Sequence, residues 1–224
     1  MSVLAERLHA VRERIARAAE QCGRDPASVR LVAVSKFHSV EAIREAYAAG
    51  QRVFGENYAQ ELADKAAQLR DLPDLAFRFI GGLQRNKAKL LVEVGCAVET
   101  LAAEAHARVL HERAVALDTR LEVMLQVNVA GEAQKSGVAV GDLPALVQAV
   151  QALDRLTLSG LMTIPPADDP AEAERCYREL ARLAQVHSLQ ALSMGMSDDL
   201  ELAVRAGATS VRVGTAIFGA RPAR

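Results

Sequence analysis

The sequence predicts an α/β protein, a single parallel (β/α)8 barrel of the TIM type with an extra N-terminal helix. Eight short apolar runs have the length and composition of strands, and helical patterns separate them. A chain of 224 residues is ordinary for one such barrel, and no low-complexity linker or composition shift divides it. We therefore expect one domain over residues 1–224. An open doubly wound sheet is the alternative, because sequence alone does not show whether a sheet closes.

The first half of the chain begins with an amphipathic helix over residues 3–22, which places Leu8, Val11 and Ile15 on one apolar stripe. Gly23 supplies the C-terminal stop of this helix. Four pairs of strand and helix are then expected. The strands are 31–36, 52–57, 77–80 and 97–100, and the helices that follow them are 39–49, 58–69, 83–92 and 102–117.

The second half repeats this alternation. Its strongest strand signal, residues 121–129, is followed by a polar loop from Gly131 to Gly137. The remaining strands are expected at 156–164, 189–193 and 210–213, and the helices at 142–153, 170–187 and 197–206. Pro165 and Pro166 stop one of these strands, because proline has no backbone N–H to donate to a strand ladder.

Lys36 ends the first predicted strand, directly after an apolar run. Alternation along a strand puts Val32, Val34 and Lys36 on one face, so an ammonium group follows hydrophobic side chains. Burial lowers the pKa of a lysine toward a neutral, nucleophilic amine, as a Schiff-base lysine requires. The alternative is a solvated lysine just past the strand, since most lysines lie at the surface.

The composition argues against several classes of function. The formal net charge is -1, which gives no electrostatic basis for binding nucleic acid or an anionic membrane. Residues 1–17 are charged and helix-periodic, unlike a signal peptide or a membrane anchor, so we expect a cytoplasmic protein. Cys22, Cys96 and Cys176 lie far apart without metal-ligand spacing, and we interpret them as reduced structural thiols rather than metal ligands.

Polar residues, and one methionine, stand near the ends of several predicted strands, where active sites of this fold lie. They are Glu56 and Asn57 after the second strand, Gln84, Asn86 and Lys87 after the third, Asn128 near the end of the fifth, and Met162 and Thr163 at the end of the sixth. Each of them also has an ordinary interpretation as a helix cap or a surface residue.

Two loops near the end of the chain carry a more specific signal. Ser193–Asp199 and Val211–Thr215 each run from a strand through glycine into a predicted helix. Backbone amides at helix starts, together with the hydroxyls of Ser197 and Thr215, form an anion site, and these loops are the usual phosphate site of the barrel. Asp198 and Asp199 argue against this site, because carboxylates in a first helical turn can themselves interact with the helix dipole that would attract a phosphate.

A Schiff-base lysine beside a phosphate site indicates pyridoxal phosphate or a phosphorylated sugar as the bound group. Arg212 alternates with Val211 and Val213, and it therefore points to the opposite side of the sheet. If that side is the barrel interior, the guanidinium meets the pyridine nitrogen and keeps it neutral, because a guanidinium donates but does not accept a proton. The alternative is that Arg212 is a structural ion-pair partner.

Seven stretches stand in unbroken order between Leu31 and Arg221. They are residues 32–36 (VAVSK), 54–58 (FGENY), 79–87 (FIGGLQRNK), 135–137 (KSG), 160–165 (GLMTIP), 193–199 (SMGMSDD) and 211–219 (VRVGTAIFG). In this combination the chain closely resembles the YggS/PROSC-type pyridoxal phosphate homeostasis proteins. The resemblance implies a barrel similar to the N-terminal domain of alanine racemase.

The resemblance also implies the cofactor and its site. Pyridoxal 5'-phosphate is expected as an aldimine on Lys36, with its phosphate around Ser197, Gly214 and Thr215 and its ring nitrogen at Arg212. The full set of expected cofactor-binding residues is Lys36, Asn57, Met196, Ser197, Arg212, Gly214 and Thr215. The chain departs from the family pattern at Phe37, Arg78 and Gly82, where threonine, histidine and proline respectively are common.

The resemblance implies the first of two main functions, and a Schiff-base aldolase, which would be a colourless protein, is a third alternative. The first is a carrier and regulator of cofactor homeostasis without substantial turnover, with apo pyridoxal phosphate enzymes as candidate partners. The second is a pyridoxal phosphate-dependent amino-acid racemase, which needs an acid/base group on each face of the cofactor. Racemases with this barrel take a tyrosine from a second domain of a partner subunit, and we expect no such domain because the sequence ends at Arg224. Of Tyr47, Tyr58 and Tyr177, only Tyr58 lies near a predicted strand end.

Overall fold

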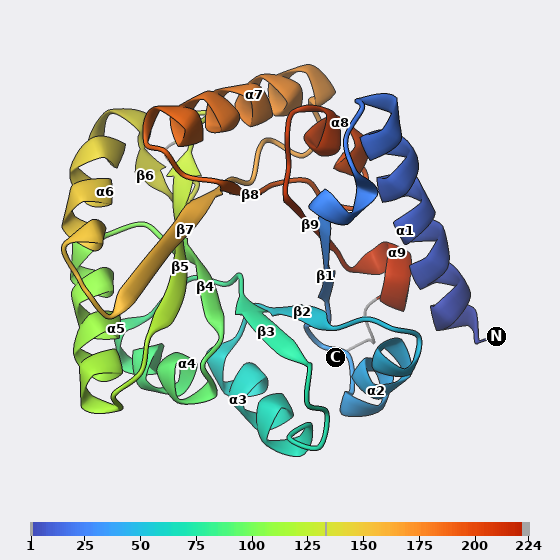
Figure 1. The fold of residues 1–224 in the computed structure, drawn as a ribbon, viewed down its shortest axis with the longest axis horizontal. Helices are drawn as coiled ribbons and strands as arrows, with labels where there is room; N and C mark the ends of the chain where they lie inside the picture. The colour runs from blue at the N-terminus through green and yellow to red at the C-terminus, as the bar shows by residue number, and fades with distance from the viewer. Residues whose placement is uncertain (1, 133, 221–224) are drawn as a thin grey trace.

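The computed structural model describes residues 2–132 and 134–220 and contains the predicted barrel (Figure 1). A ring of parallel strands forms the centre, and helices cover its outer side. The expectation of a closed α/β barrel is therefore confirmed. Met1, Ala133 and residues 221–224 lie outside the described residues, and with them lie both ends of the predicted domain and one position of the Gly131–Gly137 loop.

Eight parallel strands close the ring within the described part of the chain. They are β1 (Arg30–Val34), β2 (Val53–Glu56), β3 (Ala76–Phe79), β4 (Ala97–Leu101), β5 (Leu121–Asn128), β7 (Leu156–Met162), β8 (Ala191–Ser193) and β9 (Ser210–Val213). Each strand pairs with the next along the chain, and β1 pairs with β9, which closes the ring. A short strand that the sequence did not predict, β6 (Val138–Ala139), pairs with the end of β5 beside the ring.

Helices follow the strands and pack against the outer face of the ring (Figure 1). They are α1 (Val3–Gln21), α2 (Val40–Ala48), α3 (Ala59–Gln68), α4 (Ala88–Val94), α5 (Glu104–Ala116), α6 (Leu143–Gln151), α7 (Pro170–Val186), α8 (Leu200–Arg205) and α9 (Thr215–Phe218). None of the helices in the described residues is both long enough and apolar enough to cross a membrane.

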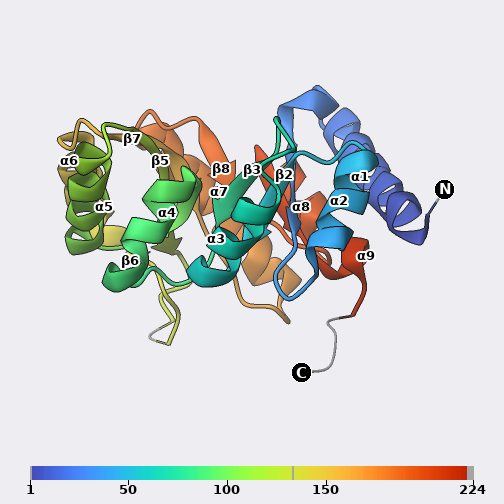
Figure 2. The same cartoon turned by 90° about the horizontal axis from the view of Figure 1, so that it is seen from below.

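The extra helix α1 lies outside the seam where the ring closes. Its buried stripe of Leu8, Val11 and Ile15 packs toward the barrel, as the amphipathic pattern predicts. Ser2 caps the helix by accepting a hydrogen bond from the backbone N–H of Ala5. α1 contacts α2, α8 and α9, and Figure 2 shows these helices gathered at one end of the molecule. This helix therefore connects the first and last parts of the chain across the β1–β9 seam.

The two faces of the strands bury different kinds of side chain. Val211 and Val213 belong to the apolar core between the ring and the helices, whereas Arg212 between them points into the ring. This is the alternation that the sequence predicts for a strand. The interior of the ring also holds Arg78 and Glu99, both almost completely buried. A charged network thus occupies space that barrels of this kind usually fill with branched apolar residues.

Several element boundaries differ from the sequence predictions; α4, for example, begins at Ala88 although the sequence predicts this helix from residue 83. Two differences concern the predicted site. β1 ends at Val34, so Lys36 lies in the turn after the strand rather than at its last position. The helix expected to start at Ser197 begins only at Leu200. The Asp199 carboxylate accepts a hydrogen bond from the backbone N–H of Met196, at 2.6 Å. Asp199 itself has a φ of -133°, outside the helical region, so the helix starts only after it.

Candidate functional site

The closure of the ring brings the first strand, β1, beside the last strand, β9. β1 and β9 pair in parallel with Val32 opposite Arg212 and Ala33 opposite Val213. In parallel strands the carboxyl ends lie on the same side, so the loops that follow β1 and β9 become neighbours. Lys36 and Thr215 are far apart in sequence but now belong to one site.

A pocket of about 360 Å³ opens at the carboxyl ends of the strands. It is lined by Val34, Lys36, His38, Asn57, Ile80, Ile164, Met196, Ser197, Asp198, Arg212, Gly214, Thr215 and Gly219. The volume lies within the range typical of small-molecule sites. All seven residues that the sequence singled out for cofactor binding are part of this lining, so the fold gathers them into one cavity.

The turn that carries Lys36 is held from behind by a buried ionic cluster. Lys65 on α3 donates to the carbonyl oxygen of Ser35 at 2.8 Å and to the carboxylates of Glu56 and Glu61 at 2.7 Å each. Glu61 also accepts from the backbone N–H of Phe37 at 2.7 Å. The residues on both sides of Lys36 are therefore fixed, and Lys36 itself is half-buried at the pocket.

The same cluster explains the unusual backbone next to Lys36. Phe37 has a φ of 67°, in the left-handed region that a bulky residue rarely adopts. The Glu61 hydrogen bond to its N–H compensates for part of this strain. Glu56 is fully buried, and burial raises the pKa of its carboxyl although the ammonium of Lys65 acts in the opposite direction.

Arg212 contributes a buried guanidinium to the pocket. One of its terminal nitrogens donates to the hydroxyl of Ser193 at 2.8 Å, and the other donates to the carbonyl oxygen of Thr163 at 3.0 Å. Burial lowers the pKa of Arg212, and the carboxylate of Glu99 partly offsets this effect. A guanidinium remains cationic under these conditions, so the pocket contains a fixed positive charge.

The loop after β8 is ordered by the side chain of Asp199. Besides the Met196 N–H, this carboxylate accepts a hydrogen bond from the hydroxyl of Tyr177 at 2.6 Å. Arg14 on α1 donates to the carbonyl oxygen of Ser197 at 2.9 Å. Of the two carboxylates that could occupy this turn, that of Asp199 binds the Met196 amide, whereas Asp198 lines the pocket together with Ser197.

The main chain directly after β3 packs closely against the backbone of Asn57. A Cβ on Gly81 would lie 1.8 Å from the carbonyl oxygen of Asn57, so only glycine allows this approach. The side-chain oxygen of Asn57 is buried and has no hydrogen-bond partner within the described residues. An orphaned acceptor in a pocket is a position where a ligand donor can bind.

Other residues predicted at strand ends lie outside the pocket. Gln84, Asn86, Lys87, Asn128, Met162 and Thr163 do not line the pocket, and Glu56 belongs to the Lys65 cluster. Thr163, for example, donates its hydroxyl to the carbonyl oxygen of Val127 and bridges two strands.

The pocket also contains residues that the sequence predictions omitted. They are Val34, His38, Ile80, Ile164, Asp198 and Gly219 as lining residues. Their positions, directly after strands or beside already predicted residues, carried the same strand-end signal. His38 stacks on Phe218, with ring centroids 4.9 Å apart, a contact between distant segments that no local pattern indicates.

A larger cavity, of about 510 Å³, lies at the opposite end of the ring. The starts of β1 to β5 line it, and its buried Arg78 already pairs with the partly exposed Glu122 at 2.9 Å. Active sites of this fold lie at the carboxyl ends of the strands. We therefore assign the candidate site to the smaller pocket with Lys36.

Comparison with known proteins identifies relatives along the whole chain. The family profile described as "Alanine racemase, N-terminal domain" matches residues 7–222. A Pseudomonas aeruginosa protein named pyridoxal phosphate homeostasis protein is 50% identical over 226 residues, covering 99% of this chain and 97% of the relative. The structure of PipY from Synechococcus elongatus with pyridoxal phosphate bound superposes with a TM-score of 0.84 at 40% identity, covering 96% of this chain and 100% of PipY.

A more distant structure shares the fold alone. The alanine racemase of Corynebacterium glutamicum superposes with a TM-score of 0.69 at 20% sequence identity. The match covers 96% of this chain and 61% of the racemase chain.

Replacing Lys65 by methionine is expected to lower the free energy of unfolding by about 3 kcal/mol at about pH 8, because it leaves Glu56 buried without its cation. In the variant the pKa of Glu56 rises further in the folded state, while in the unfolded chain it stays at about 4.3. The folded variant then binds the proton more tightly, so the loss is smaller at about pH 5. Urea unfolding at the two pH values measures it.

Lys89→Met is the matched control, because the ion pair of Lys89 with Glu93 is exposed and contributes little. Equal losses for the two variants, or a Lys65→Met loss that does not change with pH, would contradict the role of the cluster.

Proposed function

This chain belongs to the alanine racemase N-terminal domain family, and from its pocket we propose that it is a carrier and regulator of pyridoxal 5'-phosphate. In this proposal the protein binds the cofactor covalently and reversibly through Lys36 and does not turn over substrate substantially. The observation that carries the proposal is the gathering of a lysine, a buried arginine and the hydroxyl and glycine positions of two loops in one pocket.

The residues of the pocket fit this cofactor chemically. Bound pyridoxal phosphate supplies an aldehyde, an electron-withdrawing ring and a dianionic phosphate. A half-buried lysine suits the aldehyde, because partial desolvation favours the neutral amine that condenses with it. The orphaned side-chain oxygen of Asn57 supplies an acceptor for a donor on the bound group.

The phosphate is proposed to bind between the loops after β8 and β9. Ser197 and Thr215 offer hydroxyls there, and Gly214 and Met196 line the same side of the pocket. A Cβ on Gly214 would lie 3.2 Å from the carbonyl oxygen of Val34, so glycine keeps this loop close to β1. The hydroxyls therefore lie near the Lys36 turn, as binding of one small phosphorylated molecule requires.

Arg212 is proposed to face the ring nitrogen of the cofactor. A permanent cation at that position disfavours protonation of the nitrogen and weakens the ring as an electron sink. Weak stabilisation of carbanions suits a protein that holds the cofactor without consuming amino acids. The names of the relatives, and the pyridoxal phosphate bound in PipY, support this proposal by similarity.

An amino-acid racemase is the second candidate, and its support is the barrel shared with alanine racemase. A two-base racemase needs a second acid/base group at the cofactor. Tyrosine does not fill that role in the pocket of the described residues, because Tyr177 donates to Asp199 and Tyr58 packs on Phe37 with ring centroids 5.2 Å apart. The pocket in the described part of the chain thus holds no tyrosine, which favours the carrier over a racemase that relies on one.

The proposal extends to partners and location. We propose a single domain over residues 1–224 that acts in the cytoplasm, with apo pyridoxal phosphate enzymes as recipients of the cofactor. Cys22, Cys96 and Cys176 carry free thiols, which suits a reducing compartment. Burial raises the pKa of the Cys96 thiol to about 12, so this cysteine is unreactive.

Changing Lys36 to alanine is expected to abolish the covalent adduct that borohydride reduction traps on the loaded protein, because the nucleophilic amine is gone. Intact mass and peptide mapping measure the adduct. Lys89→Ala, at an exposed position on α4, is the control and is expected to retain it. An adduct that maps to Lys87, Lys89 or Lys135 and survives the Lys36 change would show the assignment to be wrong.

Changing Thr215 to valine is expected to weaken binding of pyridoxal phosphate about ten-fold or more, because the phosphate loses a charge-assisted hydrogen bond. Binding of pyridoxal, which has no phosphate, is expected to change little. Equilibrium titration with both compounds measures the difference. Thr157→Val, at an exposed position on β7 outside the pocket, is the matched control. Equal weakening for both compounds would remove the phosphate role.

Loaded wild-type protein is expected to show no enzyme-like racemisation of alanine, because Arg212 limits carbanion stabilisation. Loss of optical purity over time measures this, with an alanine racemase as the positive control. A turnover on the order of 1 per second or more would replace the carrier by the racemase.

A further inference from the structure

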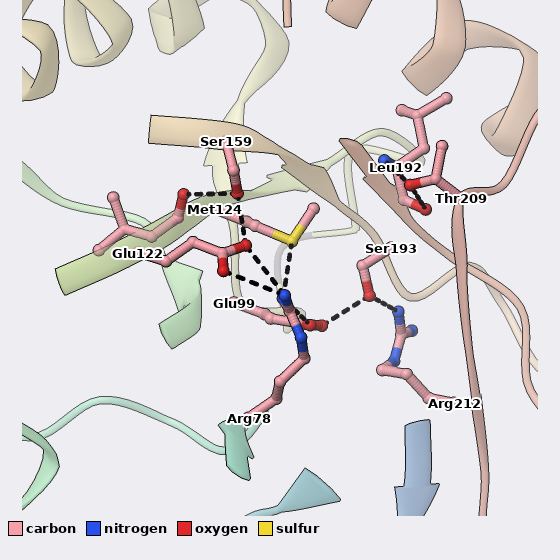
Figure 3. Close-up of polar contacts among 10 residues, drawn as sticks. Arg78, Glu99, Glu122, Met124, Ser159, Leu192, Ser193, Thr209 and Arg212 are labelled. Atoms are coloured by element: carbon pink, nitrogen blue, oxygen red, sulfur yellow. Dashed lines mark hydrogen bonds and ion pairs between the residues drawn. The ribbon is translucent and has the colours of Figure 1, made fainter. Parts of the chain in front are cut away.

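A continuous chain of hydrogen bonds crosses the interior of the ring from Arg78 to Arg212 (Figure 3). Arg78 donates to one oxygen of Glu99 at 2.8 Å, and the hydroxyl of Ser193 donates to the other oxygen at 2.6 Å. Arg212 in turn donates to the oxygen of Ser193 at 2.8 Å. We call Arg78, Glu99, Ser193 and Arg212 the interior network. It joins four strands, β3, β4, β8 and β9.

The interior network links the two ends of the barrel. Arg212 lines the candidate cofactor pocket, whereas Arg78 lines the cavity at the opposite end. Arg78 also binds both oxygens of Glu122, at 2.9 and 3.1 Å, and Ser159 donates to Glu122 at 2.9 Å. The guanidinium of Arg78 is therefore fixed between two carboxylates, those of Glu99 and Glu122.

Glu99 is the central member because it binds Arg78 directly and reaches Arg212 through Ser193. It is fully buried, and its two oxygens are divided between Arg78 and the Ser193 hydroxyl. Since Ser193 gives its single proton to Glu99, its oxygen is left to accept from Arg212. The direction of this hydrogen bond, and with it the orientation of the Arg212 guanidinium, is set by Glu99.

The charged members of the network also interact electrostatically with one another. Burial by itself lowers the pKa of Arg78, but the carboxylates of Glu99 and Glu122 more than offset this and raise the pKa. Glu99 acts in the same direction on Arg212. The negative charge of Glu99 thus offsets part of the positive charge of both arginines. Because Arg78 offsets part of the Glu99 charge, less of that charge acts on Arg212.

We propose that Arg78 and Glu99 are positioning residues that act through Ser193 on Arg212 and set the electrostatic potential at the cofactor pocket. The proposal rests on the proposed function, because it concerns the cofactor that Arg212 would contact. It assigns a role to Arg78, the position where the resembling family commonly has histidine. A neutral imidazole there would leave more of the negative charge of Glu99 to act on the pocket.

Other titratable groups near Arg212 and the pocket remain unchanged in the test. Tyr177 and Asp199 act on the pKa of Arg212. The pocket is also lined by Lys36, His38 and Asp198, and Glu122 pairs with Arg78. Because these groups are common to all variants, a difference between variants reports the substituted charge.

The test is a pH titration of the visible absorption band of pyridoxal phosphate bound to the protein, for Arg78→Met and for Glu99→Gln. Loss of the Arg78 cation is expected to raise the titration midpoint by about half a pH unit, because the pocket becomes more negative. Loss of the Glu99 charge is expected to lower it by a similar amount. The double variant removes both charges, and its midpoint is expected to return close to that of the wild type.

Arg78→Lys is the conservative control, because it keeps the charge and is expected to leave the midpoint close to that of the wild type. A merely structural role would loosen the site in every variant and move the midpoints in the same direction. Shifts of the same sign, or no shift, overturn the proposal. If Arg78→Met alone fails to fold, Glu99→Gln and the double variant, which does not leave Glu99 charged and unpaired, decide the question.

The outcome also separates this proposal from the proposed function. If wild-type protein forms no reducible adduct on Lys36, the proposed function fails. If it forms the adduct but the two charge changes do not shift the midpoint in opposite directions, only the role of Arg78 and Glu99 fails.

Discussion

The pairing of β1 with β9 is the constraint on which the candidate site depends. It closes the ring, sets Val32 opposite Arg212, and brings the Lys36 turn beside the loop that contains Gly214. A parallel pair of this kind needs the whole chain between its strands to be in place, because each strand is positioned by its neighbours. The pocket is therefore a product of closure, and α1 reinforces it by packing across the seam against α8 and α9.

Closure also creates an interior that must be filled, and this protein fills part of it with charge. Arg78 and Arg212 are balanced by the carboxylate of Glu99, with Ser193 between them. A buried ion pair of this kind contributes little net stability, whereas losing one partner costs about 3–5 kcal/mol. Such a network therefore favours one arrangement of the strands over others. Because the network ends at Arg212, this preference for one arrangement extends to the candidate site.

A second buried cluster does the same for Lys36. Lys65 binds the carbonyl oxygen of Ser35 on one side of it, and Glu61 binds the N–H of Phe37 on the other, where the backbone is in an unfavourable conformation. Glu56 supports this arrangement by pairing with Lys65. The strand-end signal in the sequence identified Lys36, but it also named Glu56 among the polar residues at strand ends and did not single out Lys65. Both belong instead to the support behind the turn. A lysine within a helical pattern carries no local sign that it will be buried, since that depends on which carboxylates the fold brings to it.

The sequence by itself determined the order of the main strands and helices, because periodicity is a local property. The full set of seven predicted residues that line the pocket came from its resemblance to the pyridoxal phosphate homeostasis proteins. The sequence did not determine the start of α8, where Asp199 has a non-helical φ of -133°, or the short strand β6. Only the tertiary structure decided closure and the pairing of Arg78 with Glu99. These depend on contacts between residues distant in sequence, whose energies exist only once the ring has formed.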